Sequence, residues 1–176
     1  MLFRSGDIVR IVGNGGIDGD LNTEIDAFAY EIGFSGPPNN TELSDGASME
    51  VPAGVTTMID SGALFKLRQS RIVVGSSTAS VDRSGAALQV LGTPVQDVFF
   101  NSFNNDALGV GQVTVPTTPR AGDWGGISFR EDVDRAQGRF IYDQEGIFLN
   151  YVNNADIQYG GGSVFVDSQQ VNITPI

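Results

Sequence analysis

One short segment of this chain, residues 130–145, is rich in carboxylates and arginines, whose types and spacing would allow catalysis. Two carboxylates can act as acid and nucleophile on a glycosidic bond; alternatively, acids can hold calcium against a uronate while an arginine serves as base. The candidate catalytic residues are Arg130, Glu131, Asp132, Asp134 and Arg135, with Arg139, Asp143 and Glu145 close behind. A solvated loop with surface ion pairs is the alternative, in which no residue of the segment is catalytic.

The chain contains no histidine and no cysteine. This excludes Ser-His-Asp triads, imidazole acids and bases, thiolate nucleophiles and zinc sites built on histidine or cysteine. The chemistry left to the chain is that of carboxylates, arginine, tyrosine or a hard cation. We expect no required cofactor, and calcium is the cation that fits the oxygen ligands of the loops.

Two loops carry side chains that suit calcium. The first resembles the opening half of a calcium-binding loop, with oxygen ligands two residues apart. The match to an EF-hand then fails, because Thr23 stands where the glycine is needed and Ala29 where the closing glutamate is needed. An acidic surface loop is the alternative. The candidate metal ligands in the two loops are Asp18, Asp20, Asn22, Asn104 and Asp106.

The charge balance limits the partners. Acidic residues outnumber basic ones by 21 to 10, which gives a formal net charge of −11. Such a balance disfavours binding to nucleic-acid phosphates. No apolar run is long enough to span a bilayer. We therefore expect no nucleic-acid partner and no membrane span; carbohydrate, cell-surface components and adjacent domains of the same chain are the partners that remain.

Three tandem units of eight residues organise the fold. Gly46, Gly54 and Gly62 recur at this interval, each in a turn where glycine reaches positive φ freely. After each glycine come two inward positions one residue apart, a period that indicates a strand. The inward pairs are Met49 and Val51, Thr57 and Ile59, and Phe65 and Leu67. Steps this short must pair as a meander or turn about a common axis, three to a coil of roughly two dozen residues in a parallel β-helix.

We predict one all-β domain over residues 1–176, in which residues 1–43 lead into or cap the solenoid and residues 44–176 form its coils. Other strands are expected at 7–12, 27–34, 71–74, 87–91, 95–101, 139–142 and 164–166. Trp124 beside Gly125 and Gly126 is predicted to be a packing anchor, and Asn154 and Gly160 to form corners. The last residues lack a capping turn, so we expect a fragment of a longer chain.

Three signatures follow one another in the sequence: VPAGVTTMIDSGA at 51–63, GDWGGI at 122–127 and ADIQYGGG at 155–162. In these the chain resembles bacterial secreted and cell-surface proteins with a right-handed parallel β-helix. The resemblance implies a right-handed β-helix, an extracellular or cell-surface location and a structural or adhesive role. It carries no catalytic residue over to this chain. For this chain we expect roughly five to six coils.

Two functions from different classes remain. The first is a non-enzymatic structural or adhesive β-solenoid module of a large secreted or cell-surface bacterial protein. The alternative is a carbohydrate-active β-helix enzyme, a polysaccharide lyase or glycoside hydrolase that uses Asp, Glu and Arg, with or without calcium. We favour the first, because long polymer grooves need stacked aromatic side chains and this chain has few.

Overall fold

A computed structural model of the chain describes residues 4, 6–13, 29–76, 85–108, 118–130, 149–162, 164–166 and 169–171. Every helix or strand assigned in these ranges is a β-strand. The strands are β1 (Ile8–Ile11), β2 (Tyr30–Gly33), β3 (Met49–Val51), β4 (Thr56–Asp60), β5 (Leu64–Arg68), β6 (Ile72–Val74), β7 (Ala87–Leu91), β8 (Val98–Ser102), β9 (Ile127–Phe129), β10 (Tyr151–Asn153), β11 (Ala155–Ile157), β12 (Val164–Val166) and β13 (Gln169–Val171).

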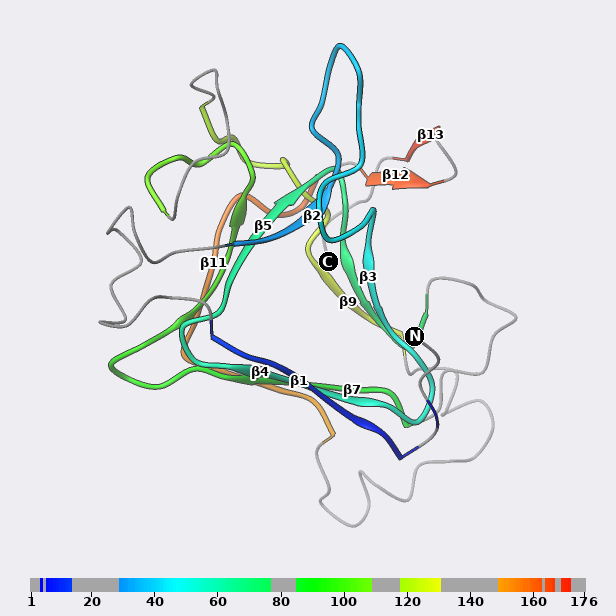
Figure 1. Cartoon of the computed structure of the whole chain (residues 1–176), viewed down its shortest axis with the longest axis vertical. Helices are drawn as coiled ribbons and strands as arrows, with labels where there is room; N and C mark the ends of the chain where they lie inside the picture. Colours follow the sequence, from blue (N-terminus) through cyan, green and yellow to red (C-terminus); the bar gives the residue numbers. More distant parts are fainter. Residues whose placement is uncertain are drawn as a thin grey trace.

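Three parallel sheets build the fold. The first sheet has the order β1-β4-β7-β10, the second β2-β5-β8-β11 and the third β3-β6-β9. Neighbours in each sheet are three strands apart in sequence, so the chain visits the three sheets in turn and then climbs one rung. The sheets form the sides of a triangle in cross-section (Figure 1). The predicted right-handed parallel β-helix is confirmed.

The three eight-residue units turn about a common axis and do not form a meander. Their strands β3, β4 and β5 lie in three different sheets. Val51, Ile59 and Leu67, one from each unit, are fully buried in a single core, as their spacing predicts. Gly46, Gly54 and Gly62 have φ values of 110°, 72° and 78°, a region that glycine adopts without strain.

Side chains of register partners on successive rungs stack in columns along the axis. In the first sheet Ile11, Ile59 and Val90 are register partners. In the second sheet the rings of Tyr30 and Phe65 have centroids 5.2 Å apart, and those of Phe65 and Phe100 are 5.1 Å apart. The core is thus a continuous apolar column that every rung extends.

The coils are longer than the sequence pattern suggests. Met49 pairs with Ile72, 23 positions later, but Gln89 pairs with Tyr151, 62 positions later. Because each rung contacts only its neighbours, loops can grow at the corners without disturbing the ladders. In the part of the chain that the structure describes, each parallel sheet has three or four strands.

Two predicted strands differ in detail. The strand expected at 95–101 begins at Val98, because Thr93 and Gln96 close a tight turn by two reciprocal backbone hydrogen bonds. Val95 in that turn is 94% exposed. The strand expected at 164–166 is present as β12 but pairs antiparallel with β13, outside the three parallel sheets. The strand expected at 139–142 lies outside the described residues.

One edge of the first rung is covered by its own chain. Asp45 exchanges hydrogen bonds with Glu31 of β2, whose N–H donates to the Asp45 carboxylate and whose carbonyl accepts from the Asp45 N–H. The Gly33 N–H donates to the Gly46 carbonyl, and the Gly33 carbonyl accepts from the Leu43 N–H. Unpaired strand edges template association with other chains, so this segment protects the end of the second sheet.

Candidate functional site

Of the predicted catalytic residues, Arg130 alone lies among the described residues; Glu131, Asp132, Asp134 and Arg135 fall outside them. Arg130 follows β9, and its N–H donates to the carbonyl of Val74 at 2.9 Å. Burial, followed by the nearby guanidinium of Arg130, lowers the pKa of Arg71, and the Glu50 carboxylate acts in the opposite direction. The catalytic constellation thus stays a prediction.

The metal ligands predicted in the first loop, Asp18, Asp20 and Asn22, lie outside the described residues. In the second loop Asp106 is exposed, while Asn104 is buried. Among the residues that the structure describes, no group of three or more Asp and Glu side chains gathers in a way that could hold a metal ion. Calcium binding at either loop stays a prediction.

A partly buried polar network occupies the corner where Asn104 lies. The Asn104 oxygen accepts from Arg68 at 3.2 Å, and its amide nitrogen donates to Asp123 at 3.2 Å. Arg68 also donates to the Ser35 carbonyl at 2.6 Å, and the Ser102 hydroxyl donates to the Asp123 carboxylate. The network ties loops of three successive rungs together, and this is what the Asn104 side chain does in this structure.

Trp124 is fully buried in the main core, as predicted for a packing anchor. Its indole N–H donates to the Gln158 carbonyl at 2.7 Å. A Cβ at Gly160 would lie 3.5 Å from the indole ring, which shows how closely the backbone passes over it. Asn154 has a φ of 42° and its amide donates to the Gly92 carbonyl at 3.1 Å, so it forms the predicted corner.

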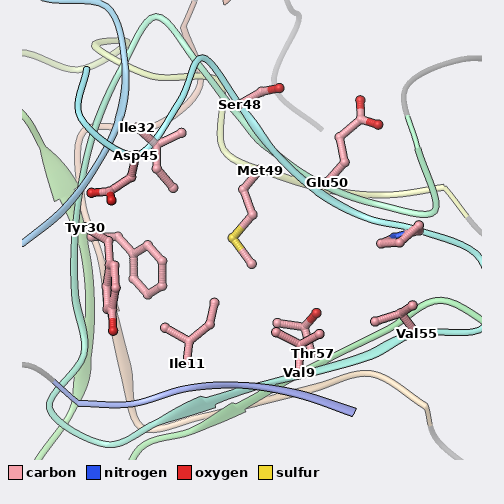
Figure 2. Close-up of a pocket in the computed structure, with 12 residues that line it drawn as sticks. Val9, Ile11, Tyr30, Ile32, Asp45, Ser48, Met49, Glu50, Val55 and Thr57 are labelled. Carbon is pink, nitrogen blue, oxygen red and sulfur yellow. The ribbon is translucent and has the colours of Figure 1, made fainter. Parts of the chain in front are cut away.

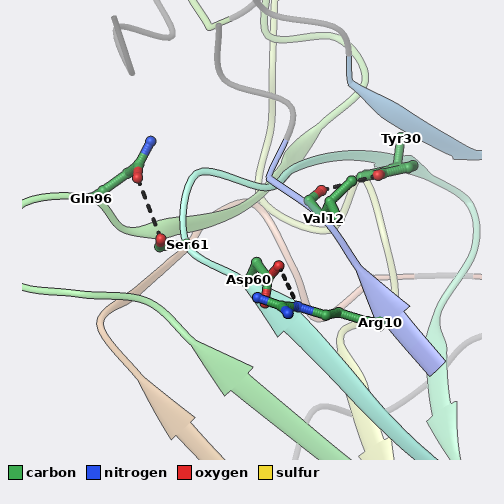
Figure 3. Close-up of polar contacts among 6 residues, drawn as sticks. All are labelled: Arg10, Val12, Tyr30, Asp60, Ser61 and Gln96. Atoms are coloured by element: carbon green, nitrogen blue, oxygen red, sulfur yellow. Dashed lines mark hydrogen bonds and ion pairs between the residues drawn. The ribbon is translucent and has the colours of Figure 1, made fainter. Parts of the chain in front are cut away.

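A polar groove lies at the corner between the first and second sheets. Its volume is about 570 Å³. Asp60 accepts from the Arg10 Nε at 2.8 Å, and Ser61 donates to the Gln96 side chain at 3.3 Å (Figure 3). We call it the corner groove; it is lined by Arg10, Val12, Gly13, Asp60, Ser61, Leu91 and Gln96.

The corner groove offers hydrogen-bonding groups beside apolar surface. Arg10 is 69% exposed, so its guanidinium can contact an external acceptor while it stays paired with Asp60. Val12 and Leu91 supply apolar contact next to these groups. Such a combination suits a ligand that carries hydroxyl or carboxylate groups on an apolar ring. Sequence reasoning missed these residues, because loops of unequal length separate them and no single period relates them.

A second cavity is the hollow at the N-terminal end of the core, with a volume of about 310 Å³. Val9, Ile11 and Met49 point into it from the first rung, and Tyr30 stands beside a second aromatic ring on its wall (Figure 2). The Tyr30 hydroxyl donates to the Val12 carbonyl at 3.0 Å. Burial, and then the carboxylates of Asp45 and Asp60, raise the pKa of Tyr30 above its usual 10.0.

Comparison with known proteins finds no relative. No family model matches the chain, and no curated protein and no solved structure is significantly similar to it. No helix among the described residues is long and apolar enough to cross a membrane.

Proposed function

We propose that this chain is a structural or adhesive β-solenoid module of a secreted or cell-surface bacterial protein, without enzymatic activity. The observation that carries the proposal is the continuity of the three parallel ladders, each of which pairs strand with strand in register along the whole described solenoid. A rod in which each rung adds about 4.8 Å through backbone hydrogen bonds resists bending and stretching.

The outer face of the first sheet is the surface we assign to contact with carbohydrate or cell-surface components. Ile8, Val12 and Tyr151 on this face are 66%, 57% and 42% exposed, with Ile8 and Tyr151 on the two edge strands of the sheet. Arg10, Met58, Gln89 and Tyr151 form one column across the face. The corner groove borders this face, so apolar and hydrogen-bonding contacts lie side by side.

Binding to immobilised neutral and uronate-containing polysaccharides tests the adhesive role. The triple variant Ile8→Ser, Val12→Ser, Tyr151→Ser removes the exposed apolar groups of the face and should weaken binding at least tenfold, about 1.4 kcal/mol. Val95→Ser is the matched control, because Val95 is 94% exposed but lies in the turn that precedes β8. Equal binding by the triple variant and the control would remove this face from the proposal.

Incubation with uronate oligosaccharides and calcium tests the absence of catalysis. We expect no new unsaturated or reducing ends. Turnover by the wild type that is lost in Arg130→Ala, with folding unchanged, would replace the structural role with the polysaccharide lyase or glycoside hydrolase alternative.

A further inference from the structure

The only lysine of the chain, Lys66, is almost completely buried, with 2% of its surface exposed. It points to the outer side of β5, because its neighbours Phe65 and Leu67 fill the core. The register of the second sheet places Lys66 directly beside Asn101 of β8 and, on its other side, beside Glu31 of β2. Register partners project from the same face of a sheet on strands about 4.8 Å apart, so the side chains of Lys66 and Asn101 are neighbours on this face.

The side chain of Asn101 is fully buried and only half satisfied. Its oxygen accepts from the Ser102 backbone N–H at 2.9 Å and from the Asn105 amide at 2.8 Å. Its Nδ2 is buried without a hydrogen-bond partner. Because a backbone N–H can only donate, it fixes which atom is the oxygen, and the orphan is the amide nitrogen. A buried polar group without a partner is rare and needs an explanation.

We propose that Lys66 and Asn101 condense into an isopeptide bond that joins β5 to β8. The neutral Nζ of Lys66 attacks Cγ of Asn101, a C–N bond forms, and the carbonyl electron pair moves to Oδ1. The carbonyl then re-forms, the bond from Cγ to Nδ2 breaks, and Nδ2 leaves as ammonia with a proton that Nζ has given up. Atoms and electrons balance without an oxidant, a reductant or a cofactor.

The two donors on the Asn101 oxygen are placed as the reaction requires. They make the carbon more electrophilic, and they stabilise the negative charge that develops on Oδ1 when the amine attacks, as an oxyanion hole does. The unpartnered Nδ2 is the leaving group, so no hydrogen bond must break when it departs.

The surroundings of Lys66 favour the neutral amine, which is the nucleophilic form. Burial lowers the pKa of Lys66 below its usual 10.5; the carboxylates of Asp106 and Glu31 act in the opposite direction without cancelling the effect. Leu64, on the same side of β5, is fully buried and packs against Phe99 of β8. A desolvated lysine beside an apolar cluster is the usual setting for an amine nucleophile in proteins.

One of the two carboxyl groups must carry the proton from Nζ to Nδ2. Asp106 has the larger electrostatic effect on Lys66, and it follows Asn105, whose amide contacts the Asn101 oxygen. Asp106 is therefore the proton carrier. Glu31 lies on the opposite side of Lys66 from Asn101, and we assign it a positioning role through its electrostatic effect on the amine.

The bond would tie one rung covalently to the next at the middle of the second sheet. It goes beyond the proposed function and does not rest on it, because the condensation depends on these side chains alone, whatever the solenoid contacts.

The intact mass of the purified full chain, after incubation at neutral pH for days, tests the proposal. We expect a mass about 17 Da below that calculated from the sequence, since ammonia has left. Proteolysis should yield one branched peptide that contains both Lys66 and Asn101. Lys66→Arg and Asn101→Ala should show the full calculated mass, whereas Asn153→Ala, at an exposed asparagine outside the cluster, should show the same loss as the wild type.

The rate of mass loss separates the two carboxyl groups. Asp106→Asn should slow it roughly a hundredfold, as removal of a general acid–base group does, and Glu31→Gln should slow it less. Wild-type protein that is folded by tryptophan fluorescence but keeps its full mass, with both residues unmodified in its peptides, would overturn the proposal. A loss of ammonia that persists in Asn101→Ala would overturn it equally.

Discussion

Phe65→Ala probes the stacked core at its centre. Phe65 is fully buried, and its ring lies between Tyr30 and Phe100 with centroid separations of 5.2 Å and 5.1 Å. Truncation of a buried phenylalanine costs about 3–5 kcal/mol through lost transfer energy and the cavity left behind. Each of the two ring contacts adds about 0.5–1.5 kcal/mol. We therefore expect the free energy of unfolding to fall by about 4 kcal/mol or more.

Chemical denaturation followed by tryptophan fluorescence measures this change, because the single Trp124 is buried in the same core. Phe129→Ala is the matched control: Phe129 ends β9 and is 46% exposed, so its truncation should cost less than about 1.5 kcal/mol. A Phe65→Ala loss below about 1.5 kcal/mol, or equal losses for both variants, would refute the continuous aromatic column.

Three further changes test local features. Burial raises the pKa of Tyr30, so its phenol stays neutral in the folded state at a pH where it ionises in the unfolded chain. The free energy of unfolding should therefore fall as pH rises above 10.0, and it should fall less steeply in Tyr30→Phe. Denaturation at alkaline pH measures both slopes. Gly33→Ala should cost at least about 2 kcal/mol in the same assay, because φ is +121° and the new Cβ would overlap the Arg68 carbonyl oxygen. Arg10→Ala should cost under about 1 kcal/mol, since its ion pair with Asp60 is exposed.

The fold was predictable where loops are absent. Between residues 46 and 68 each corner takes few residues, so the inward positions keep a fixed spacing that the sequence alone reveals. Elsewhere insertions at the corners hide the rung length. Val95 was wrongly assigned to a strand. Pro94 and Val95 lie in a tight turn, and the residues around them resemble a strand only in composition.

The side chains around the lone lysine were missed although the sequence holds a signal for them. Successive members of the series Glu31, Lys66 and Asn101 are 35 positions apart in the sequence. The same spacing separates Tyr30, Phe65 and Phe100. Two coils of equal length thus leave a 35-residue period in the segments 29–34, 64–69 and 99–104. The corner groove leaves no such period, because its residues come from coils of unequal length.

A disulfide pair tests the parallel register most directly, because the chain has no cysteine of its own. Met58 and Gln89 are register partners on the outer face of β4 and β7, where a spacing of about 4.8 Å suits a disulfide. Met58→Cys with Gln89→Cys should link under mild oxidation. Met58→Cys with Tyr151→Cys, two strands apart, should not link. Failure of the first pair in folded protein, or equal linking of both pairs, would contradict the parallel β-helix.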